Sequence, residues 1–493
     1  MKYPATRVEF SIDDAALQRL YDTACRKCKN NLQMFGTHQV LVEGGGYEKI
    51  WLETQPMGGE MYAKRNMTAA MNNQLLFIRH QREDGRLAGS IQALADGGVE
   101  PQFNKFQGFC FPWPALNMYY WAGEDRAYLD EVATALEKFD AYLWRTRDTD
   151  RDGCLESFCA YDTGEDNAVR YGDAPNYCTT DTPPVGSRVV PMASMDVTSF
   201  SYAARDTLAA ISRIRGDGQE KRWRTGADAV AAALRSRLWS HERGACFDRD
   251  CSGRTMPILT HNSLRCMYWG SFSQHMADRF VQEHLLNPAE FWTALPLPSV
   301  AVNDPAFRNA PENNWSGQCE GLTYQRAILA LERYGYEPVV TALGHRLMDA
   351  VIHGGYVFTQ QFDPFTGEPS RVSSITKEPM LPGSKDPFQD SYGPTLLAVL
   401  EYMAHIWGVT MNMGEVWFSL GSGYAYTYRQ HWGDRCYAIQ SDGCKARVLV
   451  DGVEKHVSPC GVRLVTDREG NLLRTRRIEN EAWLRRGGNY GKM

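Results

Sequence analysis

Residues 60–410 contain the feature that most restricts the fold, because apolar residues recur there with helical spacing in one segment after another. Polar loops rich in Gly and Pro separate these segments. The predicted helices are Met67–His80, Ala127–Arg145, Val197–Ile214, Arg222–Leu238, Leu322–Tyr334, Pro338–Ile352 and Thr395–Trp407. Many sequential helices of this kind favour helical hairpins arranged around a central axis. We therefore predict a mainly α fold, an α/α toroid.

Long loops rich in Trp, Tyr, Asp and Asn follow several of the predicted helices. Long loops inside a compact domain are usually functional. In a toroid of helical hairpins such loops lie at one end of the central axis. We expect the functional site at that end.

The two ends of the chain differ from the helical part. Residues 1–50 contain short extended-looking pieces and the flexible stretch Glu43–Gly46. After residue 410, short alternating segments are joined by turns, which is typical of an antiparallel sheet. The predicted strands are Glu415–Leu420, Tyr424–Tyr428, Arg435–Gln440, Cys444–Val450 and Gly461–Thr466.

These patterns predict three parts of the chain. Residues 1–50 form an N-terminal extension, residues 51–410 form the helical barrel, and residues 411–493 form a small β-rich C-terminal domain with its tail. The β-domain is expected to cover part of the toroid, because apolar faces need a covering layer.

Composition excludes several classes of protein. The 493 residues are 43% hydrophobic with a net charge of −6, which excludes a disordered chain. Scattered Lys and Arg argue against nucleic-acid and membrane-surface partners. No apolar run reaches the roughly 18 residues of a membrane span, and the polar N-terminus lacks the pattern of a signal peptide. We expect a cytoplasmic protein, either a monomer or a homo-oligomer.

Metal and cofactor signals are weak. The 13 Cys are expected to be reduced and mostly buried. Cys25 and Cys28 have the spacing of half a zinc site, but no second pair completes it. There is no Gly-rich phosphate loop, Gly-x-Ser-x-Gly elbow or His-Glu-x-x-His motif. We predict no cofactor and no resident metal.

The loops combine carboxylates with Trp, Tyr, Gln and Asn, which is the surface that a sugar requires. Apolar ring faces of a sugar stack on aromatic side chains, and its hydroxyls need planar hydrogen-bonding partners. Asp148, Asp150 and Asp152 look like the start of a calcium loop. The twelfth position of that loop is Cys159 rather than the Glu that the helix–loop–helix motif uses. A tight Asx turn and a non-standard calcium site both fit this pattern.

A second acidic loop offers candidates for proton transfer. Asp162, Glu165, Asp166 and Asp173 lie close in sequence, with Arg170 among them. Crowded carboxylates raise one another's pKa, and such a carboxyl can serve as a general acid. A solvated acidic loop has the same composition, and spacing alone does not choose between the two.

The stretches Arg147–Glu156 and Asp162–Arg170 resemble the inverting α-glycosidases of glycoside hydrolase families 37 and 63. These families include trehalases, processing α-glucosidase I and the mannosylglycerate and glucosylglycerate hydrolases. Their characteristic stretch is similar to Glu-Ser-Gly-Trp-Asp-Asn-Ser-Pro-Arg, whose Asp is the general acid and corresponds to Asp166. Asn167 and Arg170 match as well, whereas the usual Ser-Pro is Ala-Val here.

Further motifs follow in the family's order between residues 80 and 410. They are His80–Arg86, Asn287–Trp292, Asn313–Gly317 and Gln389–Thr395, the last being similar to the trehalase stretch Gln-Asp-Gly-Phe-Gly-Trp-Thr. The resemblance implies an (α/α)6 barrel, in agreement with the helical periodicity.

The chain departs from the family at the general base. The family has Glu in a stretch such as Glu-Tyr-Tyr-Asp-Pro-x-Thr-Gly, and this chain has Gln360 at that position. An amide cannot take a proton from water. Three interpretations remain open: an engineered Glu→Gln exchange, a base supplied elsewhere by Glu320 or Asp363, or a protein that binds sugar without turnover.

The resemblance implies an exo-acting, inverting α-glycoside hydrolase, such as an α-glucosidase, acting on a short α-linked glycoside or oligosaccharide. Asp166 is the implied general acid and position 360 the base position. The candidate substrate-binding residues are Trp51, Asn167, Arg170, Trp315, Gln318, Glu320, Gln389 and Tyr392. Two alternatives are a non-catalytic carbohydrate-binding protein and a sugar epimerase or isomerase. The last usually needs a pair of His acid/bases, and no such pair lies near the acidic loops.

Overall fold

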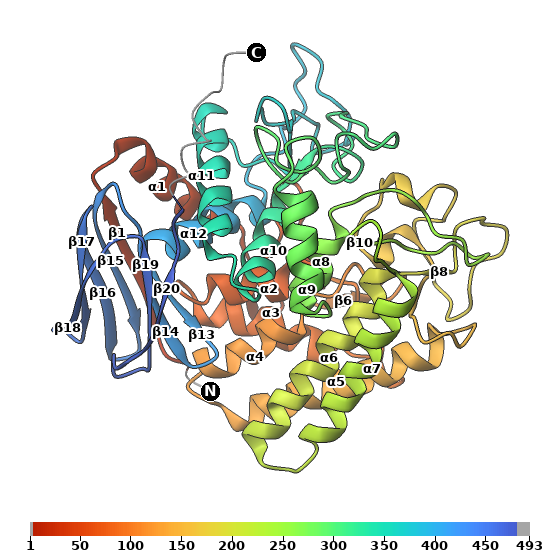
Figure 1. Cartoon of the computed structure of the whole chain (residues 1–493), viewed down its shortest axis with the longest axis horizontal. Helices are drawn as coiled ribbons and strands as arrows, with labels where there is room; N and C mark the ends of the chain where they lie inside the picture. The colour runs from red at the N-terminus through yellow and green to blue at the C-terminus, as the bar shows by residue number, and fades with distance from the viewer. Residues whose placement is uncertain (1–2, 481–493) are drawn as a thin grey trace.

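The computed structural model describes residues 3–480 (Figure 1). Most of the chain up to residue 407 is helical or looped, and antiparallel strands follow it. In Figure 1 the C-terminal strands form the left side of the molecule and the helices fill its centre. The mainly helical fold with a C-terminal antiparallel region agrees with the prediction from the sequence.

One set of helices forms an inner ring. These helices are α2 (Gln55–Tyr62), α4 (Pro112–Trp121), α6 (Met195–Arg215), α8 (Asn262–Trp269), α10 (Gly321–Glu332) and α12 (Gly393–Trp407). Each contacts the next in this order, and α12 contacts α2, so the cycle closes.

A second set of helices packs outside the ring. They are α1 (Ala15–Asn30) against α12, α3 (Met67–Arg79) against α2, α5 (Arg126–Thr146) against α4 and α6, α7 (Glu220–Arg237) against α6, α9 (Gln274–Phe280) against α8, and α11 (Glu337–His353) against α10 and α12. Short helical turns occur at η1 (Ala160–Asp162), η2 (Val169–Tyr171) and η3 (Val281–Leu285).

Burial explains which helices the sequence reveals. Helix α5 buries one face and exposes the other, so its apolar residues recur with helical spacing. Every residue of α2 and of α8 is buried, and α4 is nearly as enclosed. A short helix that is buried all round has no polar face, so periodicity does not reveal it.

The inner helices begin at the same end of the ring. Arg326 in the first half of α10 contacts Glu53, which precedes α2, at 2.6 Å. Tyr392, which precedes α12, donates to Glu320, which precedes α10, at 2.9 Å. At the opposite end Lys64, just after α2, lies 2.8 Å from Glu401 in the last turns of α12. The loops that precede the inner helices therefore meet at one end, which we call the loop end; the opposite one is the far end.

Two antiparallel sheets lie beside the ring. One has the order β1 (Thr6–Ile12), β15 (Ala425–Trp432), β16 (Arg435–Asp442), β17 (Lys445–Val450) and β18 (Val453–Pro459). The other has the order β13 (Val409–Asn412), β14 (Glu415–Leu420), β19 (Val462–Thr466) and β20 (Leu472–Arg477). The predicted strands correspond to β14, β15, β16, β17 and β19. Residues 481–493 of the predicted C-terminal domain lie outside the described residues.

Residues 1–50 were expected to form an N-terminal extension that contains short extended pieces. Strand β1 pairs along its whole length with β15, placing Phe10 opposite Tyr428. Besides short strands, this part contains a helix that was not predicted, because residues 15–30 form α1 with Asp14 as its N-cap. Leu17, Leu20, Tyr21, Ala24 and Cys28 lie on its buried face, so the helical period was present in the sequence.

Short paired strands brace the loops. They are β2 (Leu32–Phe35) with β3 (His38–Leu41); β4 (Ile50–Trp51), β5 (Ser90–Ala93) and β6 (Val99–Gln102); β7 (Glu156–Ser157) with β8 (Met192–Ala193); β9 (Trp239–Ser240) with β10 (Ala245–Cys246); and β11 (Cys319–Glu320) with β12 (Gln361–Phe362). The pairing of β11 with β12 brings residue 360 beside the start of α10, since the Gly321 N–H donates to the Gln360 carbonyl at 2.9 Å.

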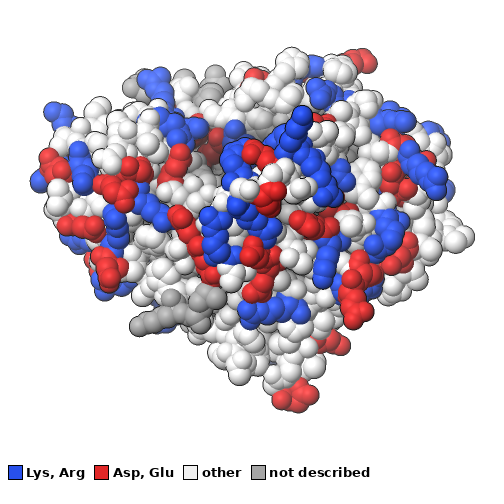
Figure 2. Space-filling model, turned by 90° about the horizontal axis from the view of Figure 1, so that it is seen from below, with Lys and Arg blue, Asp and Glu red and all other residues white. Residues whose placement is uncertain are grey.

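Surface charge and hydropathy agree with a chain of mixed character. Figure 2 shows Lys and Arg interspersed with Asp and Glu on the face it presents. Among the described residues, no helix is both long enough and apolar enough to cross a membrane.

Candidate active site

Asp166 lies at the loop end, between η1 and η2. Its Oδ2 accepts a hydrogen bond from the Tyr161 hydroxyl at 3.0 Å. Burial raises the pKa of Asp166, opposed by the hydrogen bond from Tyr161. Within residues 3–480 Asp166 has no cationic partner at ion-pair distance, unlike its acidic neighbours. A carboxyl in these surroundings is suited to hold a proton and donate it.

The other carboxylates of this loop point in different directions, and Arg170 is not the only cation near them, which corrects the expectation that they crowd together. Asp162 is fully buried and pairs with Arg147 at 2.9 Å. Glu165 pairs with Arg265 at 2.8 Å. Asp173 lies at the surface with Arg188 at 2.9 Å. The cations come from distant parts of the chain, so the sequence of the loop alone did not reveal them.

Arg170 holds the acidic loop to its surroundings. Its guanidinium pairs with Glu165, with Asp196 of α6 at 2.7 Å and with Asp248. The side chain is buried, and these carboxylates raise its pKa. Among the described residues, Asp166 does not pair with Arg170. Arg170 therefore lies behind the loop, fixing its shape.

Asn167 joins the acidic loop to the loop that carries Trp315. Its Nδ2 donates to the Asn314 Oδ1 at 2.9 Å, and its Oδ1 accepts from the Trp315 N–H at 3.1 Å. The Ser316 hydroxyl donates to the Asn167 carbonyl at 2.9 Å. Trp315 is 4% exposed and its ring meets His261 edge-on at 5.8 Å. The two loops thus form one rigid wall of the site.

Gln360 lies beside the start of α10 and contacts Tyr47. Its Oε1 accepts a hydrogen bond from the Tyr47 hydroxyl at 2.9 Å. Burial raises the pKa of Tyr47, and the charges of Glu43 and Asp166 raise it further. Tyr47 therefore lies within electrostatic reach of Asp166 while it contacts Gln360. The hydrogen bond to Tyr47 joins Gln360 to the turn of residues 43–47.

Tyr47 and Glu43 are site residues that sequence reasoning missed. Both lie on the loop that contains Gly44, Gly45 and Gly46. A Cβ on Gly44 would lie 2.5 Å from the Ser391 carbonyl oxygen, and one on Gly45 would lie 3.1 Å from the Cα of Tyr392. All three glycines have positive φ. The stretch predicted to be flexible is a close-packed turn, and its glycines were the signal that could have identified it.

The candidate site also includes Tyr392, Glu320 and Gln389. The Tyr392 hydroxyl donates to Glu320 Oε1 at 2.9 Å, and Glu320 Oε2 accepts from the Thr323 N–H at 3.1 Å. Burial raises the pKa of Glu320 to about 8. Gln389 is 1% exposed. The rings of Tyr47 and Tyr392 meet edge-on at 6.1 Å.

Trp51 and Gln318 occupy different surroundings. Trp51 is partly exposed, with Tyr47 edge-on at 6.5 Å and the Lys105 ammonium 5.2 Å from the ring centre. Gln318 is 2% exposed and its amide bonds with Asn309 and Ser370. Trp51 therefore presents an aromatic surface, whereas Gln318 braces neighbouring loops.

Several buried polar atoms at the loop end have no hydrogen-bond partner within the described chain. They include Trp51 Nε1, Gln107 Oε1 and Asn314 Nδ2. Buried polar groups are nearly always hydrogen-bonded in native proteins. Unpartnered donors and acceptors beside an aromatic ring are suited to the hydroxyls and ring face of a sugar.

Asp148, Asp150 and Asp152 come together away from this centre. One oxygen of each lies within 4.8 Å of the others. They also accept backbone hydrogen bonds, Asp152 from Cys154 at 2.8 Å and Asp150 from Asp152 at 3.1 Å. These bonds are those of Asx turns. Calcium binding at this loop stays a prediction.

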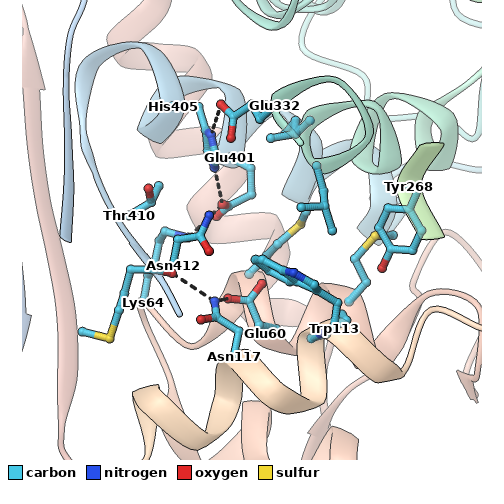
Figure 3. A pocket seen from close by; sticks show the side chains of 16 residues that line it. Glu60, Lys64, Trp113, Asn117, Tyr268, Glu332, Glu401, His405, Thr410 and Asn412 are labelled. Carbon is cyan, nitrogen blue, oxygen red and sulfur yellow. Dashed lines mark hydrogen bonds and ion pairs between the residues drawn. The ribbon is translucent and has the colours of Figure 1, made fainter. Parts of the chain in front are cut away.

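The far end of the ring encloses a cavity of about 50 Å³ (Figure 3). Glu401 pairs there with Lys64 at 2.8 Å. Glu332 pairs with His405 at 2.8 Å, and Arg463, from β19, lies 2.7 Å from it. Glu60 accepts from Asn117 Nδ2 at 2.7 Å. This cavity lies at the opposite end from Asp166, and its carboxylates are engaged by cations or amides.

The family model of the mannosylglycerate hydrolase MGH1-like glycoside hydrolase domain matches residues 52–378. This range includes Asp166 and Gln360. It begins after the turn that carries Glu43 and Tyr47.

Solved structures share the fold at low identity. A mannosylglycerate hydrolase of glycoside hydrolase family 63 from Thermus thermophilus, in complex with glucose, matches 78% of this chain and 99% of its own with 16% identity and a TM-score of 0.59. A neutral trehalase from Saccharomyces cerevisiae matches 75% and 74% with 12% identity and a TM-score of 0.55. A sialidase matches 94% of this chain and 41% of its own with 13% identity and a TM-score of 0.68. At these identities the likeness shows the fold.

Proposed function

Because this chain belongs to the mannosylglycerate hydrolase MGH1-like glycoside hydrolase family, we propose that it cleaves α-glycosidic bonds with inversion at the anomeric carbon. The observation that carries the proposal is the placement of Asp166. It is a half-buried carboxyl without a cationic partner in the described chain, and it accepts a hydrogen bond from Tyr161. The wall built by Asn167 and Arg170 holds it there.

In the proposed reaction Asp166 gives its proton to the glycosidic oxygen as the bond to the anomeric carbon breaks. Water attacks the opposite face of the sugar, so the configuration inverts. Inverting enzymes leave roughly 6.5–9.5 Å between the acid and the base to hold that water. On the side of the base, the Tyr47 hydroxyl donates to the Gln360 side chain at 2.9 Å.

We propose a hexose with a small aglycone, or a short oligosaccharide, as the substrate. Trp51 offers an aromatic face, and the unpartnered atoms of Gln107 and Asn314 offer hydrogen-bonding positions. The Thermus thermophilus relative holds glucose, which supports an α-gluco- or α-manno-configured sugar here. We propose removal of one terminal sugar at a time.

We further propose that the closed inner ring with its outer helices is an (α/α)6 barrel. In it, Trp51, Gln389, Tyr392 and Glu320 line the sugar site. Asn167, Arg170, Trp315 and Gln318 position the loops, because their polar groups are engaged by protein partners.

Carbohydrate binding without turnover is the second candidate. Gln360 supports it, because an amide at the family's base position cannot activate water. The hydrogen bond from Tyr47 to Gln360 would preserve the shape of the site in such a protein.

The test incubates the protein with α-linked gluco-, manno- and galacto-disaccharides and with glycerate α-glycosides, and measures released sugar. Turnover that disappears in Asp166→Asn supports the hydrolase. Sugar binding by calorimetry without any turnover supports the binding protein. Turnover that survives in Asp166→Asn contradicts the acid assignment.

A further inference from the structure

An inverting hydrolase with glutamine at the family's base position needs a carboxylate from elsewhere. The described chain places several buried carboxylates near Tyr47 and Gln360, and their contacts differ. A base must have an oxygen free to accept a proton from water, and it must face the side of the sugar opposite Asp166.

Two candidates considered from the sequence have both oxygens occupied. Asp363 Oδ1 accepts from the Phe365 and Thr366 N–H groups at 2.8 and 2.9 Å, and its Oδ2 accepts from Asn309 Nδ2 at 2.7 Å. Glu320 caps α10 and accepts from Tyr392. These residues hold the loop and the helix in place.

Two other carboxylates are tied to arginines. Glu53 lies 2.6 Å from Arg326 and accepts from Gln107 Nε2 at 3.3 Å. Glu165 pairs with both Arg170 and Arg265. A carboxylate bound to guanidinium groups is a weak base, because the ion pair stabilises its charged form.

Among the described residues, Glu43 differs from Glu53 and Glu165 because it has no arginine partner, and from Asp363 and Glu320 because hydrogen bonds do not occupy both of its oxygens. It is 7% exposed, and within residues 3–480 it forms no ion pair. Burial raises its pKa, while the Tyr392 hydroxyl and the Lys377 ammonium lie close enough to oppose that shift. Such a carboxylate is more basic than one held by arginine.

The turn that carries Glu43 also carries Tyr47, which reaches Gln360. The Gly393 N–H donates to the Glu43 carbonyl, so the turn is fastened to the start of α12. Lys377 lies 4.3 Å from the centre of the Tyr47 ring. Glu43 acts electrostatically on Tyr47, as Asp166 does. The turn therefore joins Glu43, through Tyr47, to the Gln360 amide.

We propose that Glu43 is the catalytic base of this chain, taking over the role that Glu has at position 360 in related enzymes, with the Gln360 amide and the Tyr47 hydroxyl positioning the water. This rests on the proposed hydrolase function. The Glu43 carboxylate takes one proton from water as the water oxygen bonds to the anomeric carbon. The glycosidic C–O bond breaks, and its oxygen receives the proton of Asp166.

The test compares wild type, Glu43→Gln and the double variant Glu43→Gln/Gln360→Glu on the glycoside that wild type turns over. Glu43→Gln should lower kcat by about 10²–10⁴-fold, the usual contribution of a general base, with KM little changed. The double variant should regain activity, because it restores a carboxylate at the family position. Glu48→Gln, on the exposed end of the same turn, is the matched control and should keep wild-type kcat.

Chemical rescue separates a base from a structural residue. Glu43→Ala with added azide should form the glycosyl azide of inverted configuration, because azide attacks without losing a proton. The inference is overturned if Glu43→Gln keeps wild-type kcat, or if Glu43→Ala folds, binds sugar and forms no glycosyl azide. It is also overturned if wild type is inert while Gln360→Glu alone is active, a result that leaves the hydrolase fold and Asp166 in place. If neither form is active, the proposed function itself fails and this inference with it.

Discussion

Both ends of the inner ring bury carboxylates, but the partners of these carboxylates differ between the two ends. At the far end Glu401 and Glu332 have a cation at hydrogen-bond distance, and Glu60 has the Asn117 amide (Figure 3). At the loop end Asp166 and Glu43 have no such cation within the described chain. A buried charge without a partner is costly, and proteins keep such groups chiefly where function needs them.

This contrast separates acidic residues that stabilise the fold from those suited to chemistry. At the loop end, this contrast also distinguishes two residues that are adjacent in sequence. Glu165 is held by Arg170 and Arg265, whereas Asp166, the next residue, bonds only to neutral donors among the described groups. The partner of each carboxylate therefore indicates its role better than its position in the sequence does.

The largest effect is expected for Asp166→Asn. The amide keeps the shape of the side chain and removes the proton that the leaving oxygen needs. We expect kcat to fall by about 10³-fold, within the range of general acid catalysis, with no loss of thermal stability. Steady-state release of sugar and a melting curve measure the two. Asp173→Asn is the control, since Asp173 lies at the surface of the same loop; an equal loss there would contradict the contrast within the loop.

The next effect is expected at the far end, on stability alone. Lys64→Met leaves Glu401 buried without its ammonium partner, because both side chains are only 3% exposed. Breaking a buried pair costs about 3–5 kcal/mol of unfolding free energy. Urea unfolding should show this loss, and the folded fraction should keep its kcat. Lys64→Met/Glu401→Gln should recover most of the stability; a variant that lost kcat instead would contradict a purely structural far end.

A pH-dependent effect is expected for Glu60. Burial raises its pKa to about 7 from an ordinary value of 4.5, with Lys64 opposing the shift. The folded state keeps the proton between these values while the unfolded state releases it. The stability of the wild type therefore falls as pH rises from about 4.5 to 7.

Glu60→Gln removes this titration and keeps the oxygen that accepts from Asn117 and Trp121. The variant should match the wild type near pH 4.5 and exceed it at pH 8 by on the order of 2–3 kcal/mol. Chemical denaturation at both pH values measures the difference. A constant difference at all pH values would show that Glu60 ionises with its ordinary pKa.

Much of the helical fold could be predicted because the outer helices and the long inner ones have an apolar face. Helices α6 and α12 were found within a few residues of their ends. Helices α2, α4 and α8 were not found, since they are enclosed by other helices and lack a polar face. Strand β1 pairs with β15 more than 400 residues away, a contact that no local pattern contains.

The candidate site shows the same limit. Asp166 and Gln360 could be located by motif, because short loops keep recognisable sequences. The cations Arg147 and Arg265, which pair with Asp162 and Glu165, could not be located by motif, because they come from other elements. Glu43 and Tyr47 have no motif of their own. Only the packing of their glycine turn against Tyr392 brings them to the site.

The most direct test of the account is the configuration of the first product. Proton NMR recorded within minutes of adding wild-type protein to an α-linked substrate shows the anomer released before mutarotation. The account predicts the β-anomer, because water attacks opposite the bond that Asp166 protonates. Release of the α-anomer would mean a retaining mechanism and would contradict the acid and base roles proposed for Asp166 and Glu43.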